Sequence, residues 1–233
     1  MITLIGFPTD KNSSYLQGAA LAPNAIMKEF YSDSRNKFSE NGVNLGLDNL
    51  WKYNGCLDLD ILDNQNEFNL INSTIKNQLE SNNYCISLGG DHSITFPIID
   101  AYHHYFPNLN ILHFDAHPDL YEDFDNNYYS HASPFARIMK NKLVNSLTQI
   151  GIRTMNDHQQ SQAKKYNVKV FKMNDFNPEM NLDIKAPIYL SIDMDALDPA
   201  FAPGVSHAEP GGLSSRDIIK IISNLEGKIV GAD

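Results

Sequence analysis

The sequence has little cysteine and no long apolar run, and each shortage excludes a class of protein. Only Cys56 and Cys85 are present among 233 residues, which is too few for a disulfide framework and is not a metal-binding pair. No apolar stretch approaches the roughly 20 residues of a membrane-spanning helix. The N-terminus, MITLIGFPTD, lacks the basic start and the cleavage site of a signal peptide. We therefore expect a cytoplasmic protein with reduced thiols and no membrane association.

Positive charge is also scarce. The chain has 18 Lys and Arg against 28 Asp and Glu, a formal net charge of −10. Binding to nucleic acid depends on Lys and Arg to neutralise phosphates, so this balance argues against a nucleic-acid partner. It is compatible with a small cationic substrate, although acidity also serves solubility alone.

Short apolar runs alternate with helical patterns along the whole chain. We expect one domain over residues 1–233, because this length supports one sizeable core. The expected strands are Thr3–Phe7, Val43–Leu47, Tyr84–Leu88, Asn110–Phe114, Leu147–Gly151, Val168–Phe171, Ile188–Met194 and Lys228–Gly231. The expected helices are Pro23–Tyr31, Asn69–Ser81, Pro97–Tyr105, Pro134–Lys140, Asp157–Tyr166 and Ser214–Leu225. This alternation predicts an α/β fold with a mainly parallel sheet covered by helices on both faces.

Polar clusters follow three of the expected strands. They are GGDHS at 89–93, DAHPD at 115–119 and DMD at 193–195. Ligands of open α/β sheets bind outside the carboxyl ends of the strands. If the strand geometry continues into these clusters, side chains at positions i, i+2 and i+4 point the same way. We therefore expect Asp115, His117 and Asp119 to converge, and Asp193 to lie beside Asp195.

Four carboxylates in one crevice repel one another unless a cation is present. Asp115, Asp119, Asp193 and Asp195 together carry four negative charges, which two divalent ions would balance. Carboxylates with the imidazoles of His92 and His117, and no thiolate, favour Mn²⁺, with Fe, Co, Ni or Zn also possible. Two ions about 3.5–4 Å apart can bind and deprotonate one water. The pattern thus predicts a two-metal hydrolase.

Each residue type alone has a structural explanation. A single Asp after a strand is typically a turn or cap residue, and a lone His is typically structural. Asp198 is better explained as a turn residue, Asp91 as a support of the metal ligands, and His113 as part of the core. The combination of the three clusters at three strand ends is much harder to explain by packing.

The three clusters, with SIDMDALDPAFAPG at 191–204, closely resemble the signature motifs of the ureohydrolases, the arginase–agmatinase family. The similarity extends to Gly18-Ala19, to Ser130-His131-Ala132, to GIR at 151–153 and to EPGGL at 209–213, so it spans essentially the whole chain. The resemblance implies a three-layer arginase-like fold and a homo-oligomer, either a trimer or a hexamer.

The resemblance also assigns roles to individual residues. It implies two Mn²⁺ ions per chain, with Asp115 and Asp193 shared between them. One ion would be bound by His92, Asp115, Asp119 and Asp193, and the other by Asp115, His117, Asp193 and Asp195. In this family's mechanism hydroxide attacks the guanidinium carbon, giving urea and an amine. Asp119 and His131 would be catalytic, with His131 as a proton shuttle.

The loop between Asp119 and His131 indicates the substrate. It contains three acids and no Lys or Arg, which suits a cationic tail better than a carboxylate. The residues around His131 and in the GIR and EPGGL segments look more like those of agmatinases than those of arginases. We therefore expect hydrolysis of agmatine to putrescine and urea, as in polyamine biosynthesis. Arginase, formimidoylglutamase and guanidinobutyrase activities remain alternatives.

Recognition of the guanidinium is less complete than the metal site. The chain ends at Asp233, whereas the resemblance implies that a Glu gripping the guanidinium follows within a few residues. We therefore expect a chain truncated at the C-terminus or impaired in activity. Glu209 and Asn156, the latter where arginases tend to carry an acid, are the candidate substrate contacts. A non-catalytic family member is the alternative outside enzymes. A two-metal phosphoesterase is disfavoured, because no Arg or Lys is placed to receive phosphate.

Overall fold

The computed structural model describes residues 1–47, 49–180 and 182–233. Its centre is one sheet of eight strands, in the order β2-β1-β3-β8-β7-β4-β5-β6. Each of its paired neighbours runs parallel. The strands are β1 (Ile2–Phe7), β2 (Trp51–Cys56), β3 (Tyr84–Gly89), β4 (Asn110–Phe114), β5 (Ser146–Ile152), β6 (Lys169–Lys172), β7 (Ile188–Ile192) and β8 (Ile229–Ala232).

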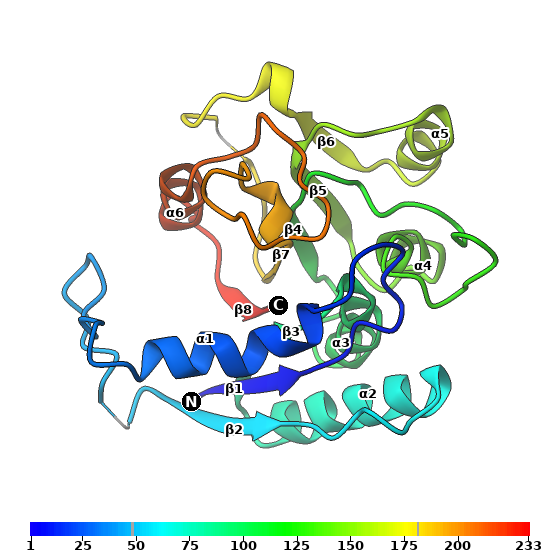
Figure 1. The fold of residues 1–233 in the computed structure, drawn as a ribbon. Helices are drawn as coiled ribbons and strands as arrows, with labels where there is room; N and C mark the ends of the chain where they lie inside the picture. Colours follow the sequence, from blue (N-terminus) through cyan, green and yellow to red (C-terminus); the bar gives the residue numbers. More distant parts are fainter. Residues whose placement is uncertain (48, 181) are drawn as a thin grey trace.

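Helices cover both faces of this sheet, as the alternation predicts (Figure 1). The α-helices are α1 (Ala22–Phe30), α2 (Asn64–Glu80), α3 (Thr95–His103), α4 (Pro134–Lys140), α5 (Asp157–Lys165) and α6 (Ser215–Ser223). Helices α2 to α5 lie on one side of the sheet, and α1 and α6 lie on the other. The result is the expected three-layer α/β fold, with a sheet that is parallel throughout its described pairs.

Two apolar clusters hold the layers together. The larger joins α2, α3 and α4 to the sheet through fully buried residues such as Ile75, Ile98 and Phe135. The smaller joins α6 to β4 and β7 through Ile218, Phe114 and Leu190. Burial of apolar surface on both faces is what a parallel sheet requires. The strands that carry the polar clusters are therefore fixed from two sides.

Two predicted elements differ from the structure by more than two residues. Residues 43–47 are not a strand; the second strand of the sheet is β2, at Trp51–Cys56. Helix α2 begins at Asn64 rather than Asn69, because the Asp63 carboxylate accepts the Asn66 N–H and caps the first turn. The first residues of this helix are polar and rich in Asn, so apolar periodicity does not indicate where the helix begins.

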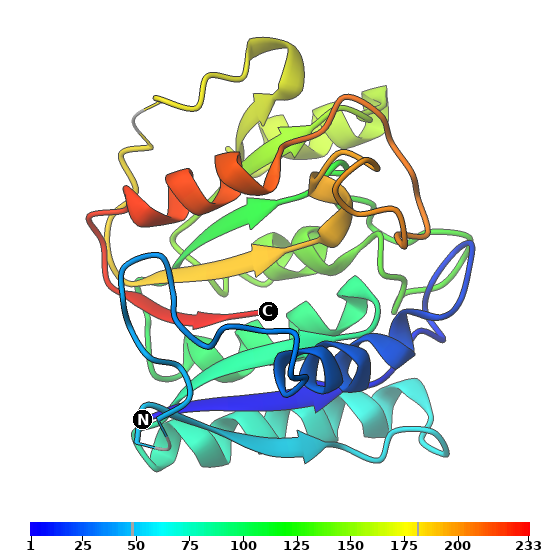
Figure 2. The same ribbon diagram turned by 60° about the vertical axis from the view of Figure 1, so that its left-hand side comes forward.

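All the strands point their carboxyl ends toward one edge of the sheet (Figure 2). The loops that follow β3, β4 and β7 meet at that edge, and Asp233 follows β8 between β3 and β7. This arrangement brings together segments far apart in the sequence. Within the described residues, none of the helices has both the length and the apolar composition to cross a membrane.

Candidate metal centre

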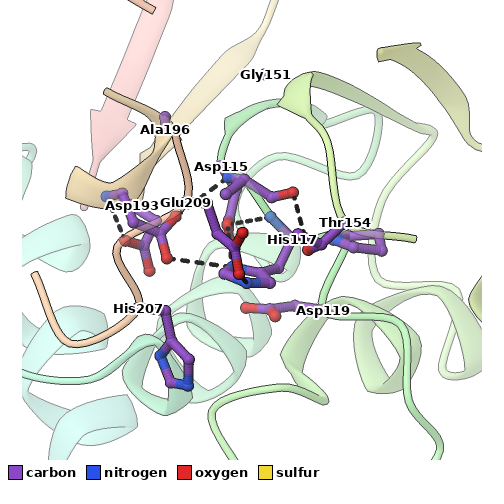
Figure 3. A network of polar contacts seen from close by, with 12 residues as sticks. Asp115, His117, Asp119, Gly151, Thr154, Asp193, Ala196, His207 and Glu209 are labelled. Carbon is purple, nitrogen blue, oxygen red and sulfur yellow. Dashed lines mark hydrogen bonds and ion pairs between the residues drawn. The ribbon is translucent and has the colours of Figure 1, made fainter. Parts of the chain in front are cut away.

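The three polar clusters meet at the carboxyl edge of the sheet, as predicted. His92 begins a short 3-10 helix after β3, and Asp115, His117 and Asp119 lie in the loop after β4. Asp193 follows β7 directly and accepts the N–H of Asp195 at 2.8 Å. Figure 3 shows Asp115, His117, Asp119 and Asp193 gathered around one space.

His92 lies at the centre of the first group of candidate ligands. Its Nδ1 is 3.3 Å from a carboxylate oxygen of each of Asp115, Asp119 and Asp193. Within the described residues, this buried nitrogen has no hydrogen-bond partner. Ligand atoms about 2.1 Å from one divalent ion stand about 3.0–3.4 Å apart. The spacing and the unpartnered nitrogen therefore fit a metal ion held by these four side chains.

His117 lies at the centre of the second group. Its Nδ1 is 3.4 Å from Oδ1 of Asp115 and 3.1 Å from Oδ2 of Asp195. These three residues form a group whose ligand atoms lie within 4.8 Å of one another. Asp115 uses one oxygen toward His92 and the other toward His117. One carboxylate is thus shared by two ligand groups, which suits a pair of adjacent metal ions.

The pKa values of these groups indicate that positive charge is stabilised at the site. Burial, and then the charge of Asp115, raise the pKa of Asp119 to about 7. Burial, and then Asp193, raise the pKa of Asp195 to about 9. Burial opposes a charge on His117, but Asp115 and Asp195 nevertheless raise its pKa to about 11. Without metal, protons on these side chains therefore offset the negative charge, and bound divalent ions would take over that role.

His113 belongs to the core, as the sequence suggested, and the structure shows that it also supports the site. It is fully buried in β4, and its ring stacks on Phe135 with centroids 3.9 Å apart. Although His113 groups geometrically with His92 and Asp115, both of its nitrogens have partners. Nε2 lies 2.9 Å from Asp115 Oδ2, and Nδ1 lies 3.0 Å from the amide nitrogen of Gln149. It is better placed to orient Asp115 than to bind a metal.

A series of hydrogen bonds on the Nε2 side of the ring orients His92. Its Nε2 lies 2.8 Å from the hydroxyl oxygen of Ser191, which donates to Asp233 at 2.5 Å. Asp233 also accepts a hydrogen bond from the Tyr189 hydroxyl. Because Nε2 faces Ser191, Nδ1 is directed at the carboxylates. A metal-binding imidazole characteristically has such support on its other nitrogen.

Arg153 ties the loops of the centre together. Its guanidinium donates to the backbone carbonyls of five residues, namely Gly151, Asp195, Ala196, Leu197 and Glu209. The segment containing Asp195 is therefore fixed relative to the end of β5. The turn after it is held by Asp198, whose carboxylate accepts the N–H groups of Ala200, Gly211 and Gly212, as the sequence suggested.

The two predicted substrate contacts have other partners in the structure. Asn156 caps α5, accepting the Gln159 N–H at 3.0 Å, and donates to the Tyr121 hydroxyl at 2.7 Å. Glu209 has its carboxylate 3.7 Å from Nε2 of His117, beside the metal ligands. Their role in substrate binding stays a prediction.

His131 lies in the wall of a cavity of about 1270 Å³ that also reaches the candidate metal ligands. Burial lowers the pKa of His131 to about 4, so its ring is neutral at pH 7. Its Nε2 contacts Ser14, and its ring stacks on that of His207, with centroids 5.7 Å apart.

Ser14 and His207 were missed by sequence reasoning. Figure 3 shows His207 beside the acidic cluster, and its ring also meets that of His117 edge-on. Each residue lies in a loop without periodicity. The only available signal was proximity to a motif: His207 stands two residues before EPGGL, and Ser14 stands four residues before Gly18-Ala19.

The acidic loop does not face the cavity as expected. Among the described residues, this loop lines the cavity with Tyr121 and Phe124 and not with Glu122, Asp123 or Asp125. Glu122 instead pairs with Lys165 of α5 at 3.2 Å. The charge of the loop therefore gives no support to a cationic substrate tail, which was the main physical reason for preferring agmatine.

The chain matches known proteins along its whole length. A model of the arginase family matches residues 1–233. A mitochondrial arginase of Medicago truncatula is 41% identical over 246 residues, covering 99% of this chain and 72% of that protein. The solved arginase of Medicago truncatula superposes with a TM-score of 0.95, and the match covers 100% of this chain and 77% of that one.

More distant relatives act on other guanidino compounds according to their names. The N(1)-aminopropylagmatine ureohydrolase of Thermus thermophilus is 30% identical, over 100% of this chain and 80% of that protein. The solved agmatine ureohydrolase of Thermoplasma volcanium is 28% identical with a TM-score of 0.88, over 100% of this chain and 80% of that one. The arginases are thus more similar to this chain than these two proteins are, contrary to the expected likeness to agmatinases.

Proposed function

This chain belongs to the arginase family, and we propose that it is a ureohydrolase with two Mn²⁺ ions that hydrolyses L-arginine to ornithine and urea. The observation that carries the proposal is the shared carboxylate of Asp115, which faces His92 with one oxygen and His117 with the other. A pair of adjoining ligand groups of Asp and His suits two divalent ions of the Mn²⁺ type.

Two observations favour arginine over agmatine. The relatives with about 40% identity carry the name arginase, and the agmatine-related relatives stand at about 30%. In addition, the acids of the loop at 121–131 do not line the cavity among the described residues, so nothing there selects a tail without a carboxylate. Agmatine, the substrate expected from the sequence, remains the competing substrate in the test below.

The metal ions would supply, when bound, a water of lowered pKa and Lewis acidity toward the reacting atoms. The chain's own residues do the rest. Asp119 would accept a hydrogen bond from the attacking water while it faces the His92 side of the centre. Asp119 adopts φ of 48°, which is uncommon for residues other than Gly, Asn and Asp. That conformation turns the chain sharply between the metal ligands and the cavity wall.

His131 would move protons between the cavity and the reacting atoms. Its ring is neutral at pH 7, because burial lowers its pKa to about 4. A neutral imidazole has one nitrogen that donates and one that accepts, which is what a proton shuttle needs. The ring would take up the proton that Asp119 accepts from the attacking water and pass it to the leaving amine nitrogen, so the ring ends neutral again as urea and the amine are released.

A substrate panel tests the proposal. The chain, loaded with Mn²⁺, is incubated with arginine, agmatine and guanidinobutyrate, and urea is measured; formamide is measured with formimidoylglutamate. We expect the highest kcat/KM with arginine. A higher kcat/KM with agmatine would reject the substrate proposed here and retain the family chemistry.

A variant control separates catalysis from contamination. His131→Asn keeps a polar side chain of similar size but cannot shuttle protons at neutral pH, so urea release is expected to fall about 100-fold or more. Bound Mn²⁺ should stay unchanged. Metal binding without any product from the wild type would favour the non-catalytic alternative.

Three further expectations stay predictions. They are the trimeric or hexameric assembly, the cytoplasmic location and the organisation as a single domain. Size-exclusion chromatography with light scattering measures the first, and a mass near that of one chain would contradict it.

A further inference from the structure

His131 has a hydrogen-bonding partner that lies 117 residues away in the sequence. The Ser14 backbone N–H lies 3.1 Å from Nε2 of His131, and the Ser14 hydroxyl oxygen lies 2.8 Å from the same nitrogen. A backbone N–H can only donate a hydrogen bond. Nε2 must therefore accept, and the proton of the neutral ring must lie on Nδ1.

We propose that Ser14 is the positioning residue of His131, holding Nε2 as an acceptor so that the neutral ring carries its proton on Nδ1. The proposal deepens the proposed function and rests on it, because it concerns the ring that would shuttle protons there. The tautomer of a catalytic imidazole is set by the hydrogen bond of its other nitrogen. Here that bond comes from the main chain, which cannot change its role.

The Ser14 loop is tied to the His131 loop at a second point. The His131 backbone N–H donates to the carbonyl of Asn12 at 3.2 Å. The Asn12 side chain accepts a hydrogen bond from the Asn127 amide at 3.3 Å. Figures 1 and 2 show the segment after β1 lying beside the loop after β4. The ring of His131 is thus held at its side chain and at its backbone by residues of one loop.

The same loop is anchored beneath the metal centre. The N–H of Asn12, a residue only 2% exposed, donates to the Asp91 carboxylate at 3.0 Å, and that carboxylate also caps the segment that begins with His92. A Cβ on Gly90 would collide with the Thr9 carbonyl, so the loop packs directly on the Gly89-Gly90 turn. Ser14 therefore keeps its place relative to the ligand His92 as well as to His131.

A second anchor fixes the start of the loop. Lys11 pairs with Glu67 at 2.5 Å, and the Glu67 side chain is fully buried in α2. The Thr9 hydroxyl donates to the same carboxylate at 3.2 Å. Geometry held from several elements is what precise placement of a reacting group requires. The network explains why an exposed residue such as Ser14 can present a fixed donor.

Protonation of the ring at Nε2 would break this arrangement. The new N–H would face the Ser14 N–H at 3.1 Å, which sets two donors against each other, with only the hydroxyl left to accept. The contact therefore favours the neutral ring as the resting form, to which the ring returns once it has passed a proton to the leaving amine. Ser14→Ala removes the hydroxyl alone and Ser14→Pro removes both donors, so the difference between these two variants isolates the main-chain N–H.

Kinetics test the hydroxyl. Ser14→Ala removes it and keeps the N–H, so kcat for urea release is expected to fall about five-fold, as the loss of one neutral hydrogen bond predicts. KM should change less than about two-fold, because the hydroxyl acts on His131 and not on substrate in the ground state. Ser14→Thr restores the hydroxyl and should restore kcat. Ser73→Ala is the matched control, since this exposed hydroxyl of α2 donates to the Leu70 carbonyl at 3.0 Å, away from the cavity, and should leave kcat unchanged.

Nuclear magnetic resonance tests the tautomer without turnover. The chain with ¹⁵N-labelled histidine, loaded with diamagnetic Zn²⁺, is compared with His131→Asn to assign the His131 signals. We expect the proton on Nδ1 in the wild type and in Ser14→Ala. Ser14→Pro removes the N–H together with the hydroxyl and, compared with Ser14→Ala, should move a substantial share of the proton to Nε2.

The two experiments distinguish failure of this inference from failure of the proposed function. A wild-type His131 with its proton on Nε2 overturns the inference, and so does unchanged kcat in Ser14→Ala. If the wild type releases no urea, the proposed function fails and the tautomer alone decides the role of Ser14. If Ser14→Pro does not fold, the wild-type tautomer and the alanine and threonine variants decide it.

Discussion

Replacing Ser191 with alanine should weaken metal binding although Ser191 is not a ligand. Its hydroxyl oxygen lies 2.8 Å from Nε2 of His92 and donates to Asp233 at 2.5 Å, and the residue is fully buried. Ser191→Ala leaves the His92 N–H and one Asp233 oxygen without this partner in a place that water reaches poorly. The ring of His92 is then free to turn away from the three carboxylates.

The expected size of the effect follows from the two hydrogen bonds that the Ser191 hydroxyl makes. Removing a hydrogen-bond partner of a metal ligand costs about 10- to 100-fold in metal affinity. That range equals about 1.4–2.7 kcal/mol of binding free energy. In the metal-free protein, the buried unsatisfied donor should lower the free energy of unfolding by about 1–3 kcal/mol.

Competition with a fluorescent chelator measures the affinity for Mn²⁺, and thermal unfolding followed by circular dichroism measures the stability of the metal-free chain. Ser87→Ala is the matched control: Ser87 is also a buried strand serine, and within the described residues its hydroxyl has no hydrogen-bond partner. It should bind Mn²⁺ as the wild type does. Equal affinities for all three proteins would refute the reasoning.

Three further predictions follow from other contacts. Arg153→Lys should lower the free energy of unfolding by about 3 kcal/mol, because an ammonium cannot reach the five carbonyls that the planar guanidinium reaches. Thermal melts measure this loss, and an unchanged melting temperature would contradict it. Burial raises the pKa of Cys85 to about 11, so iodoacetamide at pH 8 should modify Cys56 in the native protein and both thiols only after unfolding, as mass spectrometry would reveal. Asp115 and Asp195 raise the pKa of His117 to about 11 against the effect of burial, so Mn²⁺ must displace a proton from this ring when it binds. The affinity for Mn²⁺ should therefore rise from pH 6.5 to pH 8. A pH-independent affinity in chelator titrations would contradict this prediction.

The candidate metal ligands could be named from the sequence, but the reason for their convergence could not. The prediction relied on strand geometry continuing through residues 115–119 and 193–195. In the structure the chain leaves β4 and β7 at once: Asp119 has a positive φ, and Asp195 lies in a 3-10 turn capped by Asp193. The side chains meet through these turns, whose geometry a two-residue periodicity does not describe.

The sequence also could not predict which partners the charged side chains of the loops would contact. Glu122 lies three residues after Asp119, yet it pairs with Lys165, which is 43 residues away. Ser14 meets His131 across 117 residues. Such contacts depend on which loops the order of the strands in the sheet brings together. The local periodicity of the sequence does not predict this strand order. The two motif-poor loops around Ser14 and His207 were therefore missed.

The central claim is that three strand ends build one centre for two metal ions. The most direct test is the metal content of the purified chain after saturation with Mn²⁺ and desalting, measured by mass spectrometry of the metal. The account predicts two Mn²⁺ per wild-type chain and loss of metal in Asp193→Asn, which removes a carboxylate charge 3.3 Å from His92. One ion or fewer in the wild type, or two ions retained by Asp193→Asn, would contradict it.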